Sequence, residues 1–179
     1  MARMFRFLTA DEIEVKVKQV KENGLVCLLY KTARTDMDLL DETVGPANWE
    51  NDYREIKGNL YAGIGIRQNN GTMVWKWDCG IESREDGEGN EKKGEASDAF
   101  KRAGFRWGIG RELYTSPFVW IKPDKAEIKA GKDYKGNPTF KCFDKFSVEK
   151  IAYDENTGRI IGLAIRNDSK NCRAFVWQA

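Results

Sequence analysis

The feature that most constrains the fold of this chain is a run of three strand-length segments, at residues 49–56, 59–67 and 72–79. Gly58 separates the first two segments and residues 68–71 (Gln-Asn-Asn-Gly) separate the last two, and residues of these types favour tight turns. Successive strands joined by short turns pair in antiparallel fashion. The sequence therefore predicts a three-stranded antiparallel meander.

The two faces of this meander differ in character. The second segment has an apolar face that carries Leu60, Ala62, Ile64 and Ile66. Its opposite face carries Gly63 and Gly65, which leave room for a helix or another backbone to approach. In the third segment Trp75 and Trp77 share a face. Two such rings can stack nucleic-acid bases, but tryptophans in strands belong more often to a core, and the core is the interpretation we favour.

A helix is predicted directly after the meander, over residues 95–107. Its apolar side chains fall on one side when placed at 100° per residue: Ala96, Ala99, Phe100, Ala103 and Trp107. The other side carries Lys101, Arg102 and Arg106, and Arg111 follows beyond a Gly-Ile-Gly turn. The expected fold class is therefore α+β, an antiparallel β-meander packed by a basic helix.

Upstream of the meander we expect a helix, a strand and a second helix. Thr9 and Glu12 form a capping box, and the apolar residues that follow at helical spacing are Ile13, Val17 and Val20. This first helix is expected to end at Gly24, ahead of an apolar strand at residues 25–30. The second helix is predicted to have Thr35 as its N-cap and to end at Gly45-Pro46. Its inward-facing residues are expected to be Met37, Leu40 and Val44.

The C-terminal third is expected to be a small β-sheet appendage. Residues 122–139 contain prolines, glycines and lysines, which is typical of an exposed basic arm or irregular hairpin. Segments 140–153 and 159–166 are typical of a hairpin, and 172–177 of a third strand. The expected domains are residues 1–121, the core, and residues 122–179, the appendage.

Composition excludes several kinds of chemistry. The chain has 179 residues, a net charge of +2 and no histidine, which excludes Ser-His-Asp and Cys-His catalysis. Its four cysteines are far apart, which favours buried reduced thiols over a zinc site. With no P-loop either, we expect no cofactor. No segment approaches the roughly 20 apolar residues of a membrane span, so we expect a cytoplasmic protein with no membrane partner.

The basic side of the 95–107 helix is the candidate functional site. A solvated helix face is the ordinary explanation of such a surface. Here, however, residues 99–111 contain no acid and end in a Gly-x-Gly that lets a backbone approach a ligand closely. A row of cations on a helix suits a phosphate backbone, and the first expected contacts are Lys101, Arg102, Arg106 and Arg111.

Other cations are weaker candidates for the same role: Lys31, Arg34, Lys57 and Lys76. Residues 82–95 are polar and rich in glycine and are expected to form a mobile loop. Lys92 and Lys93 lie at the end of this loop. They either lengthen the basic track or belong to a solvated loop, and both explanations are open.

The motif K-R-A-x-x-x-W-G-I-G-R-x-L-Y at residues 101–114 resembles the single-strand annealing proteins of the Rad-fifty-two superfamily, particularly the short phage and prophage members of Sak type. The likeness continues upstream, in L-D-E-x-x-G-x-x-x-W at residues 40–49 and in the strand sequences at 53–58 and 61–66. Together these segments span about residues 25–121, so the likeness is more specific than any one short motif.

The resemblance implies a β-β-β-α core and a function without covalent chemistry. Members of this superfamily assemble into rings or helical filaments whose subunits line a shared basic groove. The implied activity is ATP-independent binding of single-stranded DNA and annealing of its complementary strand, in homologous recombination and double-strand break repair. The implied partners are the two DNA strands and further copies of the chain. A single-strand-binding protein is a further candidate partner, although the C-terminal half with which longer eukaryotic members bind theirs has no counterpart in these residues.

Three other functions remain alternatives. A metal-dependent nuclease is one, because Glu55-Ile56-Lys57 after Asp41 imitates an acidic metal-binding cluster. A passive single-strand binder that protects DNA without pairing it is the second. A duplex-RNA or structural oligomer role is the third, and nothing in the sequence specifically favours it.

Overall fold

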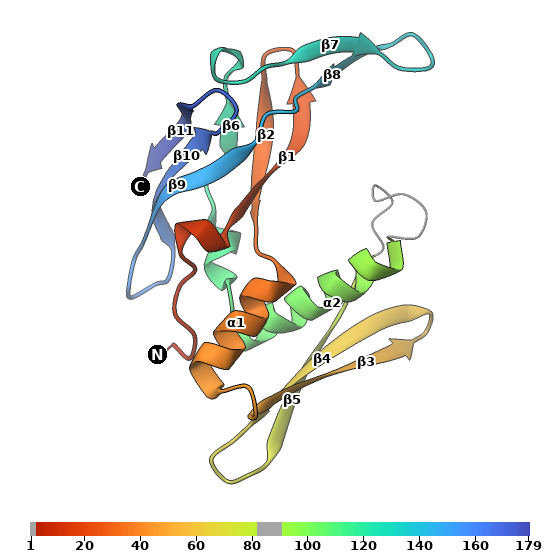
Figure 1. The fold of residues 1–179 in the computed structure, drawn as a ribbon, viewed down its shortest axis with the longest axis vertical. Coiled ribbons are helices and arrows are strands. Elements are labelled where there is room, and N and C mark those ends of the chain that lie inside the picture. The colour runs from red at the N-terminus through yellow and green to blue at the C-terminus, as the bar shows by residue number, and fades with distance from the viewer. Residues whose placement is uncertain (1–2, 82–90) are drawn as a thin grey trace. The chain divides into compact units, whose positions relative to one another are not determined.

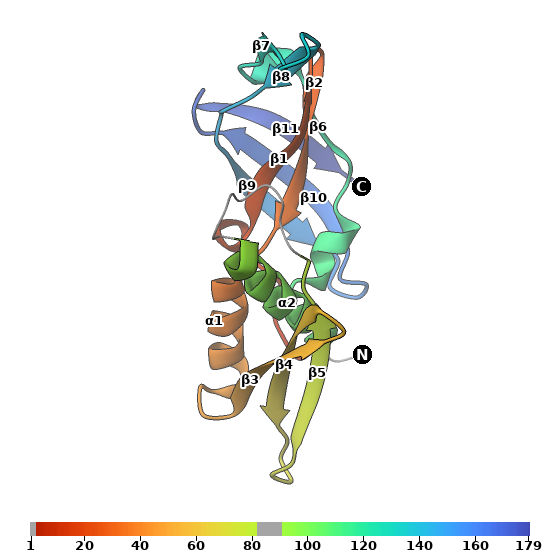
Figure 2. The same cartoon turned by 90° about the vertical axis from the view of Figure 1, so that its right-hand side faces the viewer.

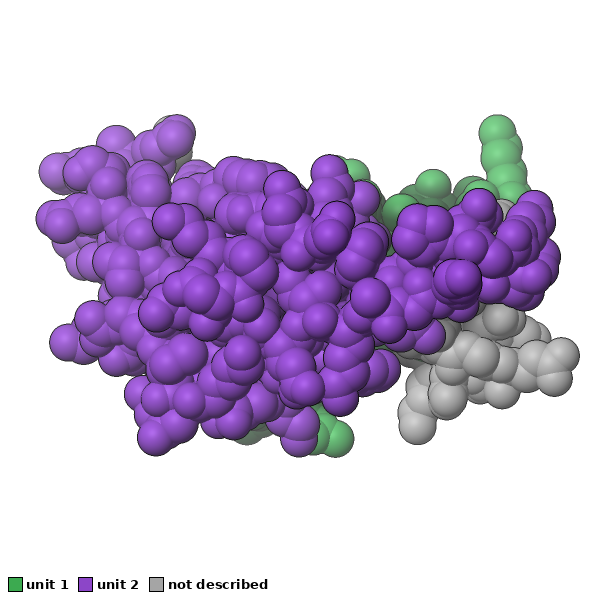
Figure 3. Space-filling model, turned by 90° about the horizontal axis from the view of Figure 1, so that it is seen from above, with its two compact units in different colours: residues 1–6, 31–111 green, residues 7–30, 112–179 purple. Residues whose placement is uncertain are grey.

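Two compact units make up the protein, one formed by residues 1–6 with 31–111 and the other by residues 7–30 with 112–179 (Figure 3). The computed structural model describes residues 3–81 and 91–179, without the side chains of 91–93. All strand pairs in this described part are antiparallel, and its α-helices are α1 (Ala33–Val44) and α2 (Glu91–Trp107). The protein is therefore a largely β fold with few helices (Figure 1).

The predicted meander is confirmed in the first unit. Its strands are β3 (Trp49–Ile56), β4 (Asn59–Arg67) and β5 (Met73–Cys79), paired in the order β3-β4-β5. Lys57 and Gly58 connect β3 to β4 with φ values of 53° and 75°. Positive φ at both residues of a two-residue turn is the geometry that suits the twist of a β-hairpin.

Helix α2 packs across β4 and β5 on one face of this sheet (Figure 2). From Gly94 onward its buried residues are Ala99, Phe100, Ala103 and Gly104, and the other two members of the predicted stripe, Ala96 and Trp107, are half-buried. Gly80 lets the end of β5 come close to the helix, because a Cβ there would lie 2.3 Å from the carbonyl oxygen of Glu95. At the other end of α2, Trp107 Nε1 donates to the carbonyl of Ile64 at 2.8 Å. The helix begins at Glu91, so the part of the expected loop from residue 91 onward is helical, while residues 82–90 lie outside the described residues.

Helix α1 differs from its prediction at the start and on its buried side. Thr32, not Thr35, is the N-cap, and its hydroxyl accepts the N–H of Thr35 at 3.1 Å. The buried stripe runs through Asp36, Leu39 and Leu40, so the expectation that Met37 faces inward is wrong. The predicted end at Gly45 is confirmed, since this residue is the C-cap with a φ of 85°.

The second unit contains a six-stranded antiparallel sheet in the order β11-β10-β9-β1-β2-β6. Its strands are β1 (Glu14–Lys21), β2 (Gly24–Tyr30), β6 (Val119–Ile121), β9 (Phe146–Tyr153), β10 (Ile160–Asn167) and β11 (Cys172–Gln178). A short hairpin of β7 (Lys129–Lys132) and β8 (Pro138–Lys141) forms most of the expected arm. The remaining elements are three 3-10 helices, η1 (Ala10–Glu12), η2 (Arg111–Thr115) and η3 (Pro123–Lys125).

The predicted first helix is wrong, because the residues after its capping box form strand β1. The box itself exists, with Glu12 accepting the backbone N–H of Thr9, but it starts only the single turn of η1. Val15 and Val17 then alternate with charged residues, and β1 pairs along its length with β2. Cross-strand pairing of a β-branched, alternating segment therefore overrides the local helix signal.

The C-terminal sheet is larger than expected because the N-terminal strands join it. The β9–β10 hairpin and β11 match their predictions, although residues 140–141 belong to β8 instead of β9. Strands β1, β2 and β6 are paired into the same sheet, so the division of the chain differs from the expected boundary after residue 121. No helix among the described residues has the length and apolarity needed to cross a membrane.

Candidate nucleic-acid interface

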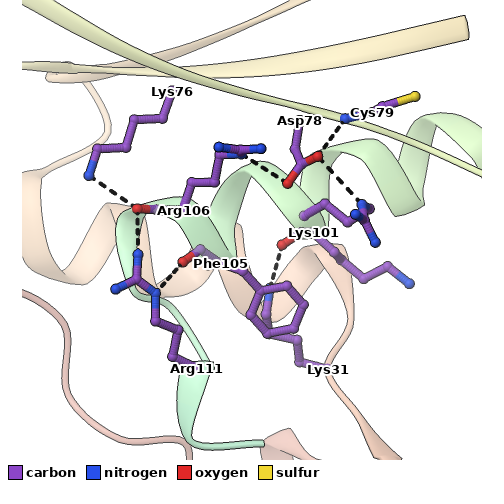
Figure 4. A network of polar contacts seen from close by, with 9 residues as sticks. Lys31, Lys76, Asp78, Cys79, Lys101, Phe105, Arg106 and Arg111 are labelled. Carbon is purple, nitrogen blue, oxygen red and sulfur yellow. Dashed lines mark hydrogen bonds and ion pairs between the residues drawn. The ribbon is translucent and has the colours of Figure 1, made fainter. Parts of the chain in front are cut away.

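Asp78, a half-buried carboxylate on the edge strand β5, pairs with two arginines of α2. Asp78 Oδ2 accepts a hydrogen bond from Arg106 Nε at 3.0 Å (Figure 4). Asp78 Oδ1 lies 3.6 Å from Arg102 Nε. The two arginines are four residues apart, so they lie on the same side of the helix. Burial by itself raises the pKa of Asp78, but the bonds from Arg106 and Cys79 and the charge of Arg102 outweigh it and hold that pKa below its ordinary value.

Two further cations meet the C-terminal end of α2. The carbonyl of Arg106 accepts hydrogen bonds from Lys76 Nζ at 3.1 Å and from Arg111 at 2.8 Å (Figure 4). Arg111 also donates to the carbonyl of Phe105 at 2.7 Å. Burial, and then the nearby charge of Arg111, lower the pKa of Lys76. We refer to Lys76, Asp78, Arg102, Arg106 and Arg111 together as the Asp78 cluster.

The Asp78 cluster has an excess of positive charge. Arg102 and Arg106 pair with the Asp78 carboxylate, whereas Lys76 and Arg111 meet at the carbonyl of Arg106. Four cations and one acid leave three positive charges in the cluster. The Arg102 and Arg106 side chains remain 40% and 57% exposed while they contact Asp78, so both still face solvent. A hollow of about 440 Å³ adjoins Arg106, and its other lining residues are Trp75, Lys76, Trp77 and Arg111. The arrangement can therefore bind an anion without first exposing a buried charge.

The same contacts have a structural explanation. Lys76 and Arg111 satisfy carbonyls that the end of a helix leaves unpaired, and cations there also complement the helix dipole. In the first half of α2, Asp98 accepts the N–H of Ile81 and Glu95 that of Leu60. Acids early and bases late in a helix are what the dipole favours. This role accounts for the positions of the four cations, but it does not neutralise the excess charge.

Lys31 does not belong to the interface, and its prediction as a DNA contact is wrong. It is 2% exposed, and its ammonium lies 2.5 Å from Asp36 of α1. The same group donates to the carbonyl of Lys101 and lies 4.1 Å from the ring centroid of Phe105. Burial raises the pKa of Asp36 to about 6, although the bond and charge of Lys31 lower it. Lys31 is therefore a structural partner of a buried acid.

Lys101 lies on a different side of α2 from the two arginines. Its charge acts on Asp36 of α1, where it lowers the pKa, whereas Arg102 and Arg106 act on Asp78 of β5. One residue of separation turns the helix by 100°, which accounts for the difference. Of the four cations first predicted to contact DNA, Arg102, Arg106 and Arg111 therefore lie together with Lys76. The fourth, Lys101, lies on the neighbouring side of the helix.

The remaining candidates are spread over the first unit. Arg34 is exposed on α1, and Lys57 is exposed in the β3–β4 turn. Lys57 lies just before the start of β4, where Leu60 donates to Glu95, whereas Lys76 pairs with Ile64 further along β4. At about 3.3 Å per residue this separates the two lysines by roughly 20 Å along the sheet. The side chains of Lys92 and Lys93 lie outside the described residues.

The positions of Trp75 and Trp77 contradict the interpretation we favoured, which placed both rings in the core. Trp75 and Trp77 are only partly buried, and they lie on the face of the sheet opposite α2, not in the core. Their rings cover Gly65 and Gly63 of β4, because a Cβ at either glycine would lie within 2.7 Å of a ring atom. The two rings are stacked, with centroids 5.6 Å apart and planes at 25°. The glycines therefore make room for rings, not for a helix.

The residues proposed for a metal-dependent nuclease do not converge. Asp41 of α1 accepts the indole N–H of Trp49, while Glu55 lies near the far end of β3. Within residues 3–81 and 91–179, no group of three or more acids, cysteines or histidines is placed to hold a metal ion. The four cysteines are free thiols; Cys27 is buried, as expected, but the other three are only partly so.

The comparisons with known proteins add no relative. No protein-family model matches the chain, and no curated protein matches its sequence. The Rad-fifty-two resemblance therefore stays a prediction drawn from the motifs.

Proposed function

We propose that this protein binds single-stranded DNA and anneals complementary strands without nucleotide hydrolysis, as a short member of the Rad-fifty-two superfamily. The observation that carries the proposal is the Asp78 cluster, in which four cations from β5, α2 and the segment after α2 are joined by contacts to one carboxylate and to the carbonyl of Arg106. A protein surface with three unneutralised positive charges beside a hollow attracts phosphates.

The chemistry of annealing suits cations that contact phosphate and leave the bases unread. Two complementary strands repel each other through their phosphates, and neutralising these charges lowers the barrier to pairing. Contacts to phosphate carry no sequence information, so any complementary pair is served. Arg102 and Arg106 are preorganised for this task, because Asp78 already holds both guanidinium groups on one side of α2.

The arrangement of the first unit supports the proposed family. Strands β3, β4 and β5 are followed by α2, which is the β-β-β-α order that the resemblance implies. On this proposal the copies of the chain form a ring or filament and align their Asp78 clusters along the DNA. A single-strand-binding protein is a proposed further partner, and the proposed setting is recombination and double-strand break repair in the cytoplasm.

The test is an annealing assay with complementary oligonucleotides in the absence of nucleotide and metal. The wild-type chain is expected to speed duplex formation. If the four cations of the cluster each neutralise one phosphate, the logarithm of the affinity for single strands falls with the logarithm of salt at a slope of about −2.8 per subunit. The double variant R102Q/R106Q is expected to reduce this slope to about −1.4 and to lose most of the acceleration.

Two matched variants separate charge from folding. K18Q/K21Q removes two exposed cations from β1 in the second unit and is expected to anneal like the wild type. R102K/R106K keeps both charges and is expected to retain binding, because a lysine serves as a point charge for phosphate. Normal annealing by folded R102Q/R106Q, with a single thermal transition like that of the wild type, would overturn the assignment of the cluster.

The alternatives give different outcomes in the same assay. A passive single-strand binder slows duplex formation while showing the same salt dependence of binding. A nuclease shortens labelled DNA when a divalent metal is added. K101A, tested alone, shows whether DNA follows the Lys101 side of α2 as well, as the motif predicts.

A further inference from the structure

The open face of the β3-β4-β5 sheet carries a flat aromatic surface that the annealing proposal does not use. The Trp77 ring lies over Gly63 and the Trp75 ring over Gly65, so neither indole is lifted away from the sheet by a side chain beneath it. Within the described part of the first unit, α1 and α2 pack on the other face. The two indoles are therefore partly exposed to solvent, side by side and nearly parallel.

The surroundings of the two rings are charged. Arg54 of β3 lies over Trp77, with its guanidinium carbon 4.3 Å from the ring centroid, and Asp52 holds this arginine at 3.0 Å. The register places Asp52 and Glu50 beside Gly63 and Gly65 on the same face of the sheet. The cores of protein–protein interfaces are depleted of charged residues, so this setting is unlike the contact surface of a second copy.

The rings and the cations share one hollow. Trp75 and Trp77 line it together with Lys76, Arg106 and Arg111, because the hollow lies at β5, the edge strand of the sheet. Residues on the two faces of an edge strand can both reach its rim. One ligand can therefore contact an indole and a cation at the same time, which requires a planar apolar group joined to an anion.

We propose that Trp75 and Trp77 are a stacking platform for the bases of single-stranded DNA whose phosphates lie on the cations of the Asp78 cluster. The inference rests on the proposed function and adds the bases to it. Stacking on an aromatic ring is sequence-tolerant, since every base has a π-face. A base held by its face also keeps its Watson–Crick edge open for a complementary strand, as annealing requires.

An abasic oligonucleotide separates this inference from the proposed function. It has the phosphates of oligo-dT but no bases, so it is expected to bind the wild-type chain about fivefold or more weakly than oligo-dT at equal salt. The variant W75L/W77L is expected to bind both oligonucleotides equally, with the salt slope unchanged. F118L/F143L removes two exposed aromatic rings from the second unit and is expected to keep the preference for oligo-dT.

Each result has one meaning. Equal binding of the two oligonucleotides by the wild-type chain overturns the stacking platform and leaves the phosphate contacts standing. Absence of binding to either oligonucleotide overturns the proposed function. A preference for oligo-dT that persists in folded W75L/W77L places the bases elsewhere and overturns the platform. A loss of oligomeric mass in W75L/W77L, with the preference retained, assigns the rings to an interface between copies.

If W75L/W77L fails to fold, quenching of the tryptophan fluorescence by oligo-dT but not by the abasic strand supports the platform, and equal quenching overturns it.

Discussion

The two units differ in one group of charged side chains, although both have exposed ion pairs of one base and one acid, such as Arg54–Asp52 in the first unit. In the second unit, each ion pair of the sheet and its hairpin joins one base to one acid, as in Lys16–Glu14, Lys129–Glu127 and Arg173–Glu149. In the first unit, two arginines share Asp78, and beside them Lys76 and Arg111 donate to the carbonyl of Arg106. The net charge of +2 for the whole chain hides this contrast. Local imbalance of charge, and not its total, distinguishes a surface that attracts phosphate from one that is merely well solvated.

The interior of the first unit also contains a buried ion pair of one base and one acid, Lys31 and Asp36. Breaking this pair is expected to have the largest effect on stability. Lys31→Met leaves the buried Asp36 without its cation, and the loss of one partner of a buried pair costs about 3–5 kcal/mol in the free energy of unfolding. Chemical denaturation at pH 7.5 measures it. A loss below about 1 kcal/mol would mean that the pair is accessible to water.

The cost of Lys31→Met should depend on pH. Burial raises the pKa of Asp36 to about 6 in the folded chain, above its ordinary value, and Lys31 is the group that opposes the rise. The contribution of Asp36 to stability is thus fully present at low pH and is lost as pH rises through about 6. Without Lys31 the pKa rises further, so a neutral carboxyl at pH 5 needs no cation. Denaturation at pH 5 should therefore show a smaller loss than at pH 7.5, and equal losses would contradict the raised pKa.

A smaller effect is expected where α2 passes the same buried acid. A Cβ at Gly104 would lie 2.4 Å from Asp36 Oδ2, so Gly104→Ala overpacks the site at a cost of about 1–3 kcal/mol. Alanine otherwise favours a helix by about 1 kcal/mol over glycine. In an Asp36→Ala background the clash is absent, and the substitution should become neutral or stabilising. A double-mutant cycle in denaturant tests this reversal of sign.

Replacing Asp78, the one acid of the cluster, increases the excess of positive charge there. Asp78→Asn leaves four cations with no carboxylate, which should weaken folding slightly and strengthen binding of single-stranded DNA. A gain of about 0.5–1 kcal/mol corresponds to roughly two- to fivefold tighter binding at low salt. Fluorescence anisotropy with a labelled oligonucleotide measures it. Unchanged binding by the folded variant would show that DNA does not meet the cluster.

The smallest effect is expected for the one-to-one pairs of the second unit. Arg173 donates to both oxygens of Glu149 on an exposed part of the sheet, where solvent screens the pair and leaves it little effect on stability. Arg173→Gln should therefore leave the free energy of unfolding nearly unchanged and DNA affinity unaltered. A clear loss of DNA affinity would extend the interface to the second unit and remove the contrast between the units.

Local signals were sufficient for the first unit's main elements. Tight-turn residues bounded β3, β4 and β5 to within one residue, and the period of Ala99, Phe100 and Ala103 placed the buried side of α2. The same kind of signal misled us at β1, where the capping box of Thr9 was real but pairing with β2 decided the conformation. No local pattern could show that β1 and β2 join strands from the far end of the chain.

The candidate site was predictable in part. Arg102, Arg106 and Arg111 were identified from their spacing in the motif. The acid that Arg102 and Arg106 share, Asp78, was not identified, although it follows Trp77 on a predicted strand. The fact that Asp78 and Lys76 share one face of that strand was a usable signal. Lys31 resembled any surface lysine in the sequence, because its burial depends on Asp36 and Phe105 meeting around it.

The order of amino acids alone determined that three strands and a basic helix follow one another, since turns and helical stripes depend on neighbours within a few residues. Long-range packing determined which cations face solvent and which are buried, and on which face the tryptophans lie. The physical reason is that a side chain's exposure and its charge partners depend on segments distant in sequence, as when Asp78 of β5 meets Arg102 and Arg106 of α2.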